Sequence, residues 1–533
     1  MYGYPTLKST LCSNRAQNKR HRKEPDKESI PFSDGFPIKE NIMTTNRRAF
    51  LQSAGALLAG AGLARSVSAM PTERPEKFDE SFDVVVLGAG GAGLTAAIRL
   101  AEGGKKVLLA EKLAFCGGSS LICGGGVAVT ETDLQKKAGI KDSVETLYED
   151  IMRTGGQLCD KEVVRAYAEA SPDYYVWAMK HGMVLNTENL SQSGSVPRNL
   201  SVNTQKSIDT WTKLAKKAGV DLRTGTKGEK LLYDGKAKRI CGVQLSTKAG
   251  VRNVEAKDGV VIATGGFARN KALLEKYVPR MKNASTICAM GCDGDGLKMA
   301  LAYGADVADM PYIKATFAFN LKATSIRDAC WVFRDGAIVL NKEGKRFCNE
   351  EISKKDIGDY VLDQPDAVAF NLYDDAIRSD AIGMDEAGGS VTYSEKKGLV
   401  LKGDTIEEVA KKAGLDPKVV RETVDRYNED AKTTGVDRDF GRKHLVDISG
   451  KIRPIEKPPF YIFPATAVLI STYCGVKING KAEVTDVFGD VIPSLYAAGE
   501  VTGSFHGRSY LGSTAFGKAL IFGYIAAGTI LKA

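Results

Sequence analysis

The sequence predicts an α/β fold, and three consecutive features near residue 80 carry that prediction. An apolar, β-branched run over 84–87 is typical of a buried strand. It ends in the turn Gly88-x-Gly90-x-x-Gly93, which opens a small-residue helical run over 94–100. A second apolar run over 107–110 then ends at Glu111. A strand, a glycine turn, a helix and a second strand in this order form one βαβ unit.

Each part of this unit has a physical role in holding a dinucleotide. Gly88 permits the tight turn, Gly90 lets the backbone approach a pyrophosphate, and Gly93 lets the helix pack closely on the sheet. The positive end of the helix dipole then faces the phosphates. Glu111 stands about 20 residues further on, where a carboxylate binds a ribose hydroxyl. The sequence therefore predicts a dinucleotide site.

Length and charge indicate the number of domains and argue against a nucleic-acid partner. A chain of 533 residues exceeds what one core usually supports, so two domains are expected. The net charge is +9, and many of the basic residues fall within the first 48 positions. No later basic run is interleaved with aromatic residues, so we expect no nucleic-acid partner.

The ten cysteines show no CxxC and no CxxCH pattern. Cys288 and Cys292 stand four positions apart, which is the wrong spacing for a zinc knuckle or a haem attachment site. We expect buried or idle thiols, no metal site and no c-type haem carried by this chain.

The first 69 residues predict export. Residues 1–42 are polar and charged, which predicts a disordered extension and makes Met43 a possible start. The stretch 43–69 holds Arg47-Arg48, a short apolar region and a small-residue cleavage site, which together predict a twin-arginine signal peptide and a periplasmic protein. No later stretch reaches about 18 consecutive apolar residues, so we expect no stable membrane insertion.

Further along the chain, glycine and serine dominate the loop 116–127, which predicts contact with an anion or a flat ring. Residues 143–220 show helical spacing, and 220–254 alternate like short strands. A buried strand over 260–263 runs into a second glycine turn.

Several further motifs add a family resemblance that covers nearly all of residues 80–530. They are the early glycine motif, Gly117-Gly118, Ala263-Thr264-Gly265-Gly266, Gly294-Asp295-Gly296, Asn341-x-x-Gly344-Lys345-Arg346-Phe347, Ala498-Gly499-Glu500 and His506-Gly507 to Gly512. This combination resembles the flavoprotein family of fumarate reductases and succinate dehydrogenases. Its wider circle includes urocanate reductases, other exported enoate reductases and 3-oxosteroid dehydrogenases.

The resemblance implies an FAD-binding Rossmann-like domain formed by two chain segments, 79–310 and 455–533, with an inserted α+β capping domain over 311–454. A cap over a flavin excludes water and so protects the hydride in transfer. The membrane-complex members attach FAD through a histidine in the early loop, where this chain has serines, so FAD is expected to be non-covalent. The positions implied to contact it are Gly88, Gly90, Ala92, Gly93, Glu111, Ser119, Ser120, Gly124, Gly125, Asp295, Glu500, His506, Ala515 and Phe516.

The chain departs from the family where dicarboxylates are bound. A histidine expected after Tyr312-Ile313-Lys314-Ala315 is Thr316, and an expected His-x-Thr-Met reads Ser471-Thr472-Tyr473-Cys474. An arginine expected before the late Leu-Gly is Tyr510, and Lys354-Lys355 replace the arginine proton donor. Fumarate and succinate are therefore not expected to be natural substrates.

Four residues remain as candidates for catalysis: Tyr510, Lys355, Tyr473 and Arg508. A phenol can hydrogen-bond a carbonyl oxygen or pass a proton, and a lysine can donate a proton. An arginine can hold one carboxylate through two hydrogen bonds. This set suits an unsaturated acid or ketone with one polar head. Tyr473 as a packing residue and Lys355 as a solvated surface lysine are the alternatives.

Three functions follow from these residues and from the resemblance. The first is an exported FAD-dependent reductase of an α,β-unsaturated carboxylate or carbonyl compound, supplied with electrons by a separate c-type cytochrome in anaerobic respiration. The second is a 3-oxosteroid dehydrogenase, because Ser509-Tyr510-Leu511-Gly512 and Phe522-Gly523-Tyr524 resemble that branch. The third is an electron-transfer flavoprotein subunit without a substrate of its own.

Overall fold

The computed structural model describes residues 72–313, 315–383, 391–445 and 450–533. The predicted extension and the predicted signal peptide lie outside these residues. The chain divides into two units, Met1–Ser68 and Ala69–Ala533, and the described residues all belong to the second unit.

An eight-stranded sheet holds the predicted βαβ unit and confirms the α/β class. β1 (Glu80–Leu87) pairs in parallel with β2 (Val107–Ala110), and α2 (Gly91–Glu102) connects them. The order β18-β19-β9-β1-β2-β6 is completed by β6 (Asp221–Arg223), β9 (Gly250–Ile262), β18 (Glu483–Thr485) and β19 (Val491–Ala497), while β7 (Lys227–Asp234) and β8 (Arg239–Thr247) continue from β9. Because β19 pairs in parallel with β9, the early and late parts of the chain build one sheet.

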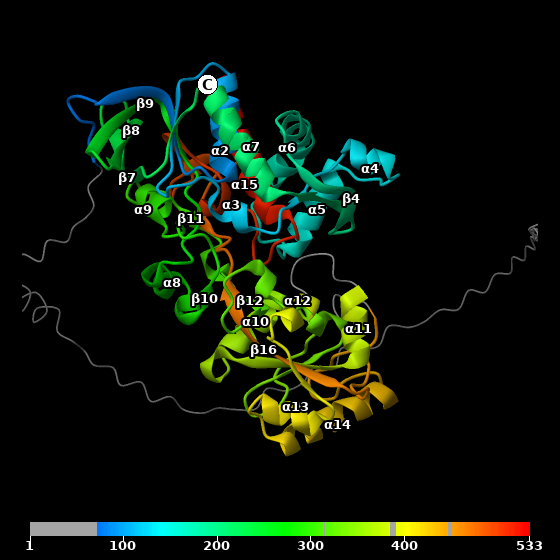
Figure 1. Ribbon diagram of the computed structural model, residues 1–533. Coiled ribbons are helices and arrows are strands. Elements are labelled where there is room, and N and C mark those ends of the chain that lie inside the picture. The colour runs from blue at the N-terminus through cyan, green and yellow to red at the C-terminus, as the bar shows by residue number, and fades with distance from the viewer. Residues whose placement is uncertain (1–71, 314, 384–390, 446–449) are drawn as a thin grey trace, which may run out of the picture. The chain divides into compact units, whose positions relative to one another are not determined.

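The C-terminal helix α15 (Thr514–Lys532) packs on α2, as Figure 1 shows. A Cβ at Gly523 would lie 2.3 Å from the carbonyl oxygen of Ala92, so only glycine permits this approach of the two backbones. α15 is long and apolar enough to cross a membrane, but 67% of its apolar window is buried within the protein. We therefore interpret α15 as a core helix.

Residues 143–220, predicted to be helical throughout, contain α5 (Val144–Thr154), α6 (Lys161–Lys180) and α7 (Thr204–Lys217). Between α6 and α7 the prediction is wrong, because β4 (Leu185–Ser193) and β5 (Val196–Val202) form a hairpin there. β4 is largely exposed and polar, so it lacks the apolar alternation that would have indicated a strand. β5 also pairs with β3 (Gly126–Ala128). Shorter elements nearby are α3 (Gly118–Ile122) and α4 (Asp133–Lys137).

A second, six-stranded sheet is organised around β16 (Phe460–Leu469), which pairs antiparallel with β14 (Ala369–Asp374) over six residues. The other strands are β10 (Ser285–Thr286), β12 (Thr316–Asn320), β13 (Ile338–Leu340) and β15 (Leu401–Gly403). β10 and β16 lie outside the predicted insertion 311–454, so this sheet takes strands from both flanking segments. An apolar run such as β16 indicates a buried strand but does not indicate its sheet.

Helices that accompany the second sheet are α10 (Lys354–Leu362), α11 (Asp375–Gly383), α12 (Val391–Lys396), α13 (Ile406–Lys412) and α14 (Pro417–Thr433), which Figure 1 shows in yellow-green to orange. The remaining elements are α8 (Lys271–Tyr277), α9 (Asp295–Leu301), β11 (Val307–Ala308) and β17 (Gly475–Val476).

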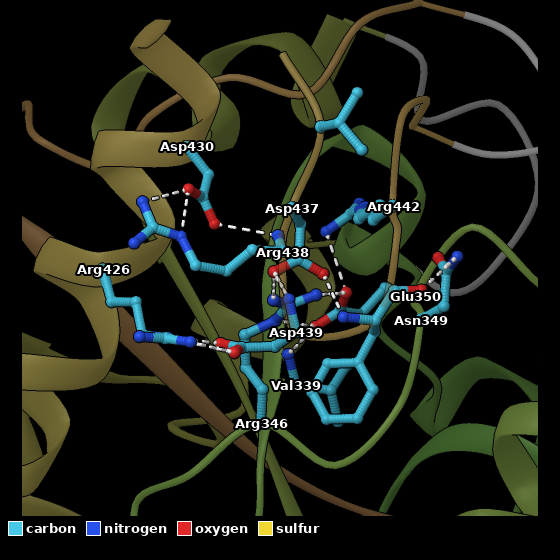
Figure 2. Close-up of polar contacts among 12 residues, drawn as sticks. Val339, Arg346, Asn349, Glu350, Arg426, Asp430, Asp437, Arg438, Asp439 and Arg442 are labelled. Carbon is cyan, nitrogen blue, oxygen red and sulfur yellow. Dashed lines mark hydrogen bonds and ion pairs between the residues drawn. The ribbon is translucent and has the colours of Figure 1, made fainter. Parts of the chain in front are cut away.

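A buried ion cluster lies just before α10 (Figure 2). The Arg346 guanidinium donates to both oxygens of Glu350, at 2.9 and 2.7 Å, and to Asp437 at 2.5 Å. Arg442 lies 3.4 Å from Glu350, and the amide of Val339 donates to Glu350 at 3.0 Å. Glu350 precedes α10 by four residues, and the helix itself begins after its N-cap Ser353, whose hydroxyl accepts a hydrogen bond from the amide of Asp356 at 3.2 Å.

Candidate functional site

A cavity of about 560 Å³ lies beyond the carboxyl ends of β1, β2 and β9. Of the positions predicted to contact the dinucleotide, it is lined by Gly88, Gly90, Ala92, Glu111, Ser119, Ser120, Gly124, Gly125, Asp295, Glu500, Ala515 and Phe516. Residues from three distant parts of the chain thus meet at one site, as a crevice at the carboxyl edge of a parallel sheet requires.

Gly93 and His506 do not line this cavity. A Cβ at Gly93 would lie 1.8 Å from the carbonyl oxygen of Gly88, so Gly93 packs α2 against the preceding turn. His506 is buried behind two tyrosines and faces a smaller cavity.

The first part of the cavity offers backbone and carboxylate groups. A Cβ at Gly118 or Gly124 would meet nothing within 4 Å, so bare backbone borders open space there. Glu111 accepts hydrogen bonds from the amides of Ala89 and Leu113, both at 2.8 Å. A carboxylate has about four acceptor sites, so Glu111 can still accept hydrogen bonds from ribose hydroxyls.

The opposite wall carries residues that sequence reasoning missed. Trp331, Lys354 and the segment Thr324–Ile326 line the same cavity from the part of the chain between the two predicted FAD segments. The Lys354 ammonium lies 4.8 Å from the centre of the Trp331 ring. The sequence indicated Lys354-Lys355 as the replacement of the family's arginine proton donor, whereas nothing in it distinguished Trp331 or the segment Thr324–Ile326.

Two predicted catalytic residues, Tyr473 and Tyr510, line the cavity side by side. Their rings stack with centroids 4.7 Å apart and planes 14° apart. His506 meets both rings edge-on, at 5.5 Å and 5.9 Å between centroids. Lys355 is only 5% exposed, and its ammonium lies 4.6 Å from the Tyr473 ring centre.

Lys355 and Arg508 do not line the large cavity. Both line a smaller cavity on the other side of the tyrosine pair. Arg508 is exposed and its side chain packs beside Gly156. The four predicted catalytic residues are therefore neighbours, but the two tyrosines separate the two cations from the large cavity.

A family model described as "FAD binding domain" matches residues 83–515. The chain belongs to this family. It is 34% identical to a "Fumarate reductase (cytochrome)" of Shewanella frigidimarina over 84% of this chain and 76% of the relative. It is 31% identical to a urocanate reductase of Eggerthella lenta, over 91% and 80%. An acrylate reductase flavoprotein subunit of Shewanella woodyi is 29% identical, over 91% and 98%.

Solved structures agree with this assignment. The open conformation of a flavocytochrome c3 fumarate reductase superposes with a TM-score of 0.73 and 29% identity, covering 95% of this chain and 84% of that one. A 3-ketosteroid Δ4-(5α)-dehydrogenase from Rhodococcus jostii RHA1 gives a TM-score of 0.71 and 25% identity, covering 87% and 100%. This FAD-binding chain is thus a flavoprotein reductase of the fumarate reductase family, whose relatives reduce C=C bonds.

The residues of the large cavity fit FAD. The bare backbone at Gly118 and Gly124 and the start of α2 suit a pyrophosphate, and Glu111 suits a ribose. Asp295 forms an ion pair with Lys112 at 2.8 Å at the same end. The twelve-residue helix α2 begins after Gly90, which has no side chain to cap it, and the amide of Gly91 donates to the Ser120 hydroxyl at 3.0 Å.

Burial decides the protonation of the groups around the tyrosines. Burial, and then the neighbouring Tyr510, raise the pKa of Tyr473 well above its usual value, so Tyr473 stays a neutral phenol that can donate. Burial, with Lys518 and Lys355 nearby, lowers the pKa of His506 well below its usual value. The imidazole is therefore neutral, and its Nδ1 has no hydrogen-bond partner.

Proposed function

We propose that this protein is an exported FAD-dependent reductase of an α,β-unsaturated carboxylate or carbonyl compound other than fumarate. The observation that carries the proposal is the stacked pair Tyr473 and Tyr510 in the cavity lining, to which Lys354 also belongs. A diacid needs a strong cationic partner at each end. Beside the two phenols, the cavity lining offers an indole and the ammonium of Lys354, while Lys112 and Lys227 pair with Asp295 at the nucleotide end. This lining suits a substrate with one polar head and an apolar remainder.

Each of these groups has a place in the reduction. When bound, FAD supplies the hydride. The phenols of Tyr473 and Tyr510 donate hydrogen bonds to the substrate oxygen, where negative charge develops. Lys354 holds the carboxylate, and Trp331 excludes water from that end of the cavity. The proton for the α-carbon comes from a tyrosine directly, or from Lys355 through a tyrosine, because the tyrosine pair separates Lys355 from the large cavity.

The electron source and the compartment are part of the same proposal. The sequence has no CxxCH motif, so we propose a separate c-type cytochrome as donor, in a terminal step of anaerobic respiration. A similar protein is named "Fumarate reductase (cytochrome)", which supports this type of donor. The twin-arginine pattern supports a periplasmic location, and Ser119 and Ser120 in the early loop support non-covalent FAD.

Anaerobic reoxidation of the reduced holoprotein tests the proposal. The protein is reduced with dithionite and mixed with acrylate, methacrylate, cinnamates, urocanate, fumarate and a 3-oxo-Δ1-steroid, while flavin absorbance is followed. We expect rapid reoxidation by at least one monocarboxylic enoate and much slower reoxidation by fumarate. Fast reoxidation by fumarate alone contradicts the proposed substrate class.

A 3-oxosteroid dehydrogenase is the second candidate, favoured by the tyrosine pair and by the apolar residues Ile287, Ile326 and Ile470 in the cavity lining. The similarity to a 3-ketosteroid dehydrogenase structure supports it. Reoxidation by the steroid alone would establish this candidate. Silence with every compound would favour the electron-transfer subunit.

A further inference from the structure

A second, small cavity lies behind the tyrosine pair. Its volume is about 10 Å³, which is close to the space that one water molecule needs. Tyr473 and Tyr510 line both this cavity and the large one, so the two phenols form the partition between them.

The residues that line the small cavity range from exposed to buried. Arg508 is exposed, and Tyr312 and Ser509 are partly exposed. Lys355 and His506, on the inner side, are only 5% and 3% exposed. Tyr312, Ser509 and Lys355 in this lining carry polar side-chain groups, and a buried water usually needs two to four polar partners.

The reaction creates a need for such a route. Each turnover forms two C–H bonds on the substrate, one with a hydride and one with a proton. The donor, Lys355 or a tyrosine, is left without its proton and must regain it from bulk water. With FAD and substrate bound, little room for water would remain in the large cavity.

We propose that the small cavity is the proton inlet of the enzyme, in which Tyr312 and Ser509 hold the water that returns a proton to Lys355 and the tyrosine pair. This inference rests on the proposed function. The proton moves from bulk water to the bound water and then to the donor, and no group changes its oxidation state. Tyr312 and Ser509 are positioning residues, since they touch the water and not the substrate.

The matched pair Ser509→Val and Ser509→Thr tests the inlet, because the two variants have the same shape and differ only in the hydroxyl. Reduced holoenzyme is mixed with the best enoate in H2O and in D2O, and flavin reoxidation is timed. We expect Ser509→Val and Tyr312→Phe to slow reoxidation about tenfold and to enlarge the solvent isotope effect. We expect Ser509→Thr to retain the wild-type rate, and all three to keep the wild-type substrate affinity, measured by titration of the oxidised flavin.

Tyr360→Phe is the control, because Tyr360 lies on α10, is 49% exposed and lines neither cavity. Unchanged rates in Ser509→Val and Tyr312→Phe would overturn the inlet while leaving the reductase intact. Equal slowing in Ser509→Val and Ser509→Thr with an unchanged isotope effect would show a packing role and overturn it too. A wild-type protein that no enoate reoxidises would overturn the function and the inlet together.

A crystal structure of the oxidised holoenzyme gives a readout that needs no substrate. We expect a water in the small cavity within hydrogen-bonding distance of the Lys355 Nζ atom in wild type, and its loss in Ser509→Val. A dry cavity in the wild type would overturn the proposal.

Discussion

Two regions of this protein bury charged side chains, and they differ in how those charges are stabilised. In the cluster of Arg346, Glu350, Asp437 and Arg442, every charge has an opposite charge within 3.4 Å. Behind the tyrosine pair, Lys518 is 2% exposed, and its Nζ donates to the carbonyl oxygen of Thr502 at 2.6 Å.

The protonation behaviour of the two regions differs accordingly. Burial alone would raise the pKa of Glu350, but Arg346 and Arg442 hold it below its usual range. Burial lowers the pKa of Lys518 to about 8, although the nearby Asp309 acts in the opposite direction. Burial raises the pKa of Asp309 to about 6, against Lys518 and the amides of Ser504, His506 and Gly507, which donate to it. Close pairing thus keeps the side chains of the cluster ionised, while the site region contains groups that titrate near neutral pH.

The largest expected effect is the loss of a partner from the paired cluster. Glu350→Gln keeps the shape of the side chain but leaves Arg346 and Arg442 without its charge. We expect a loss of about 3–5 kcal/mol in the free energy of unfolding, because breaking a buried pair strands the remaining charge. Urea unfolding at pH 7 measures it, with the exposed Glu343→Gln as the matched control. A loss as small as that of the control would show that the cluster is not locked by charge.

Lys518→Met should have a smaller effect of the opposite sign. At pH 7 the folded protein holds a buried ammonium at a cost, so its removal should stabilise by about 1–2 kcal/mol after the lost hydrogen bond is counted. Since the folded pKa is lowered to about 8, the folded state loses its proton before the unfolded state does. Wild-type stability therefore rises with pH above about 8, and the advantage of the variant shrinks. Urea unfolding at pH 7 and pH 9.5 measures the stability difference and its dependence on pH. A variant that is less stable than the wild type and whose stability changes with pH as the wild type's does would contradict this account.

Asp309→Asn should change stability by about 1 kcal/mol, because asparagine keeps an oxygen to accept from the loop amides. The carboxyl of Asp309 has a raised pKa of about 6 in the folded state. Between about pH 4 and pH 6 the unfolded chain releases this proton first, so wild-type stability falls as pH rises there. The variant should lack that contribution, which melting temperatures at pH 4.5 and pH 6.5 would reveal. If the melting temperatures of the wild type and the variant change with pH in parallel, a group other than Asp309 causes the pH dependence.

The lining at one end of the cavity could be predicted from the sequence, because backbone chemistry is local. Glycines at 88, 90, 124 and 125 each line the cavity, and those at 88 and 125 also permit turns with positive φ. Glu111 follows its strand directly, so the strand itself places it. Fixed spacing along one βαβ unit was enough to locate Gly88, Gly90 and Glu111, whereas Gly124 and Gly125 followed from the family resemblance.

The substrate end could not be predicted to the same degree, because it depends on side-chain direction and on distant packing. Lys354 and Lys355 are neighbours on α10, and successive helical residues point about 100° apart. Lys354 consequently lines the large cavity and Lys355 the small one. Trp331 reaches the cavity only through folding of the second sheet, which no local pattern reports.

The variant with the smallest expected effect tests whether burial or pairing alone makes the charges of the cluster important for stability. Arg426 and Asp439 form a two-pronged pair at the edge of the cluster (Figure 2), but their side chains are 50% and 35% exposed. Water screens such a pair and solvates the partner that remains, so Arg426→Gln should leave the urea midpoint of the wild type unchanged. Equal midpoints at low and high salt would support this view. A loss of stability comparable to that of Glu350→Gln would mean that pairing alone, without burial, stabilises this part of the chain. The difference between the ion cluster and the site region would then have to rest on the geometry of the pairs rather than on the exclusion of solvent.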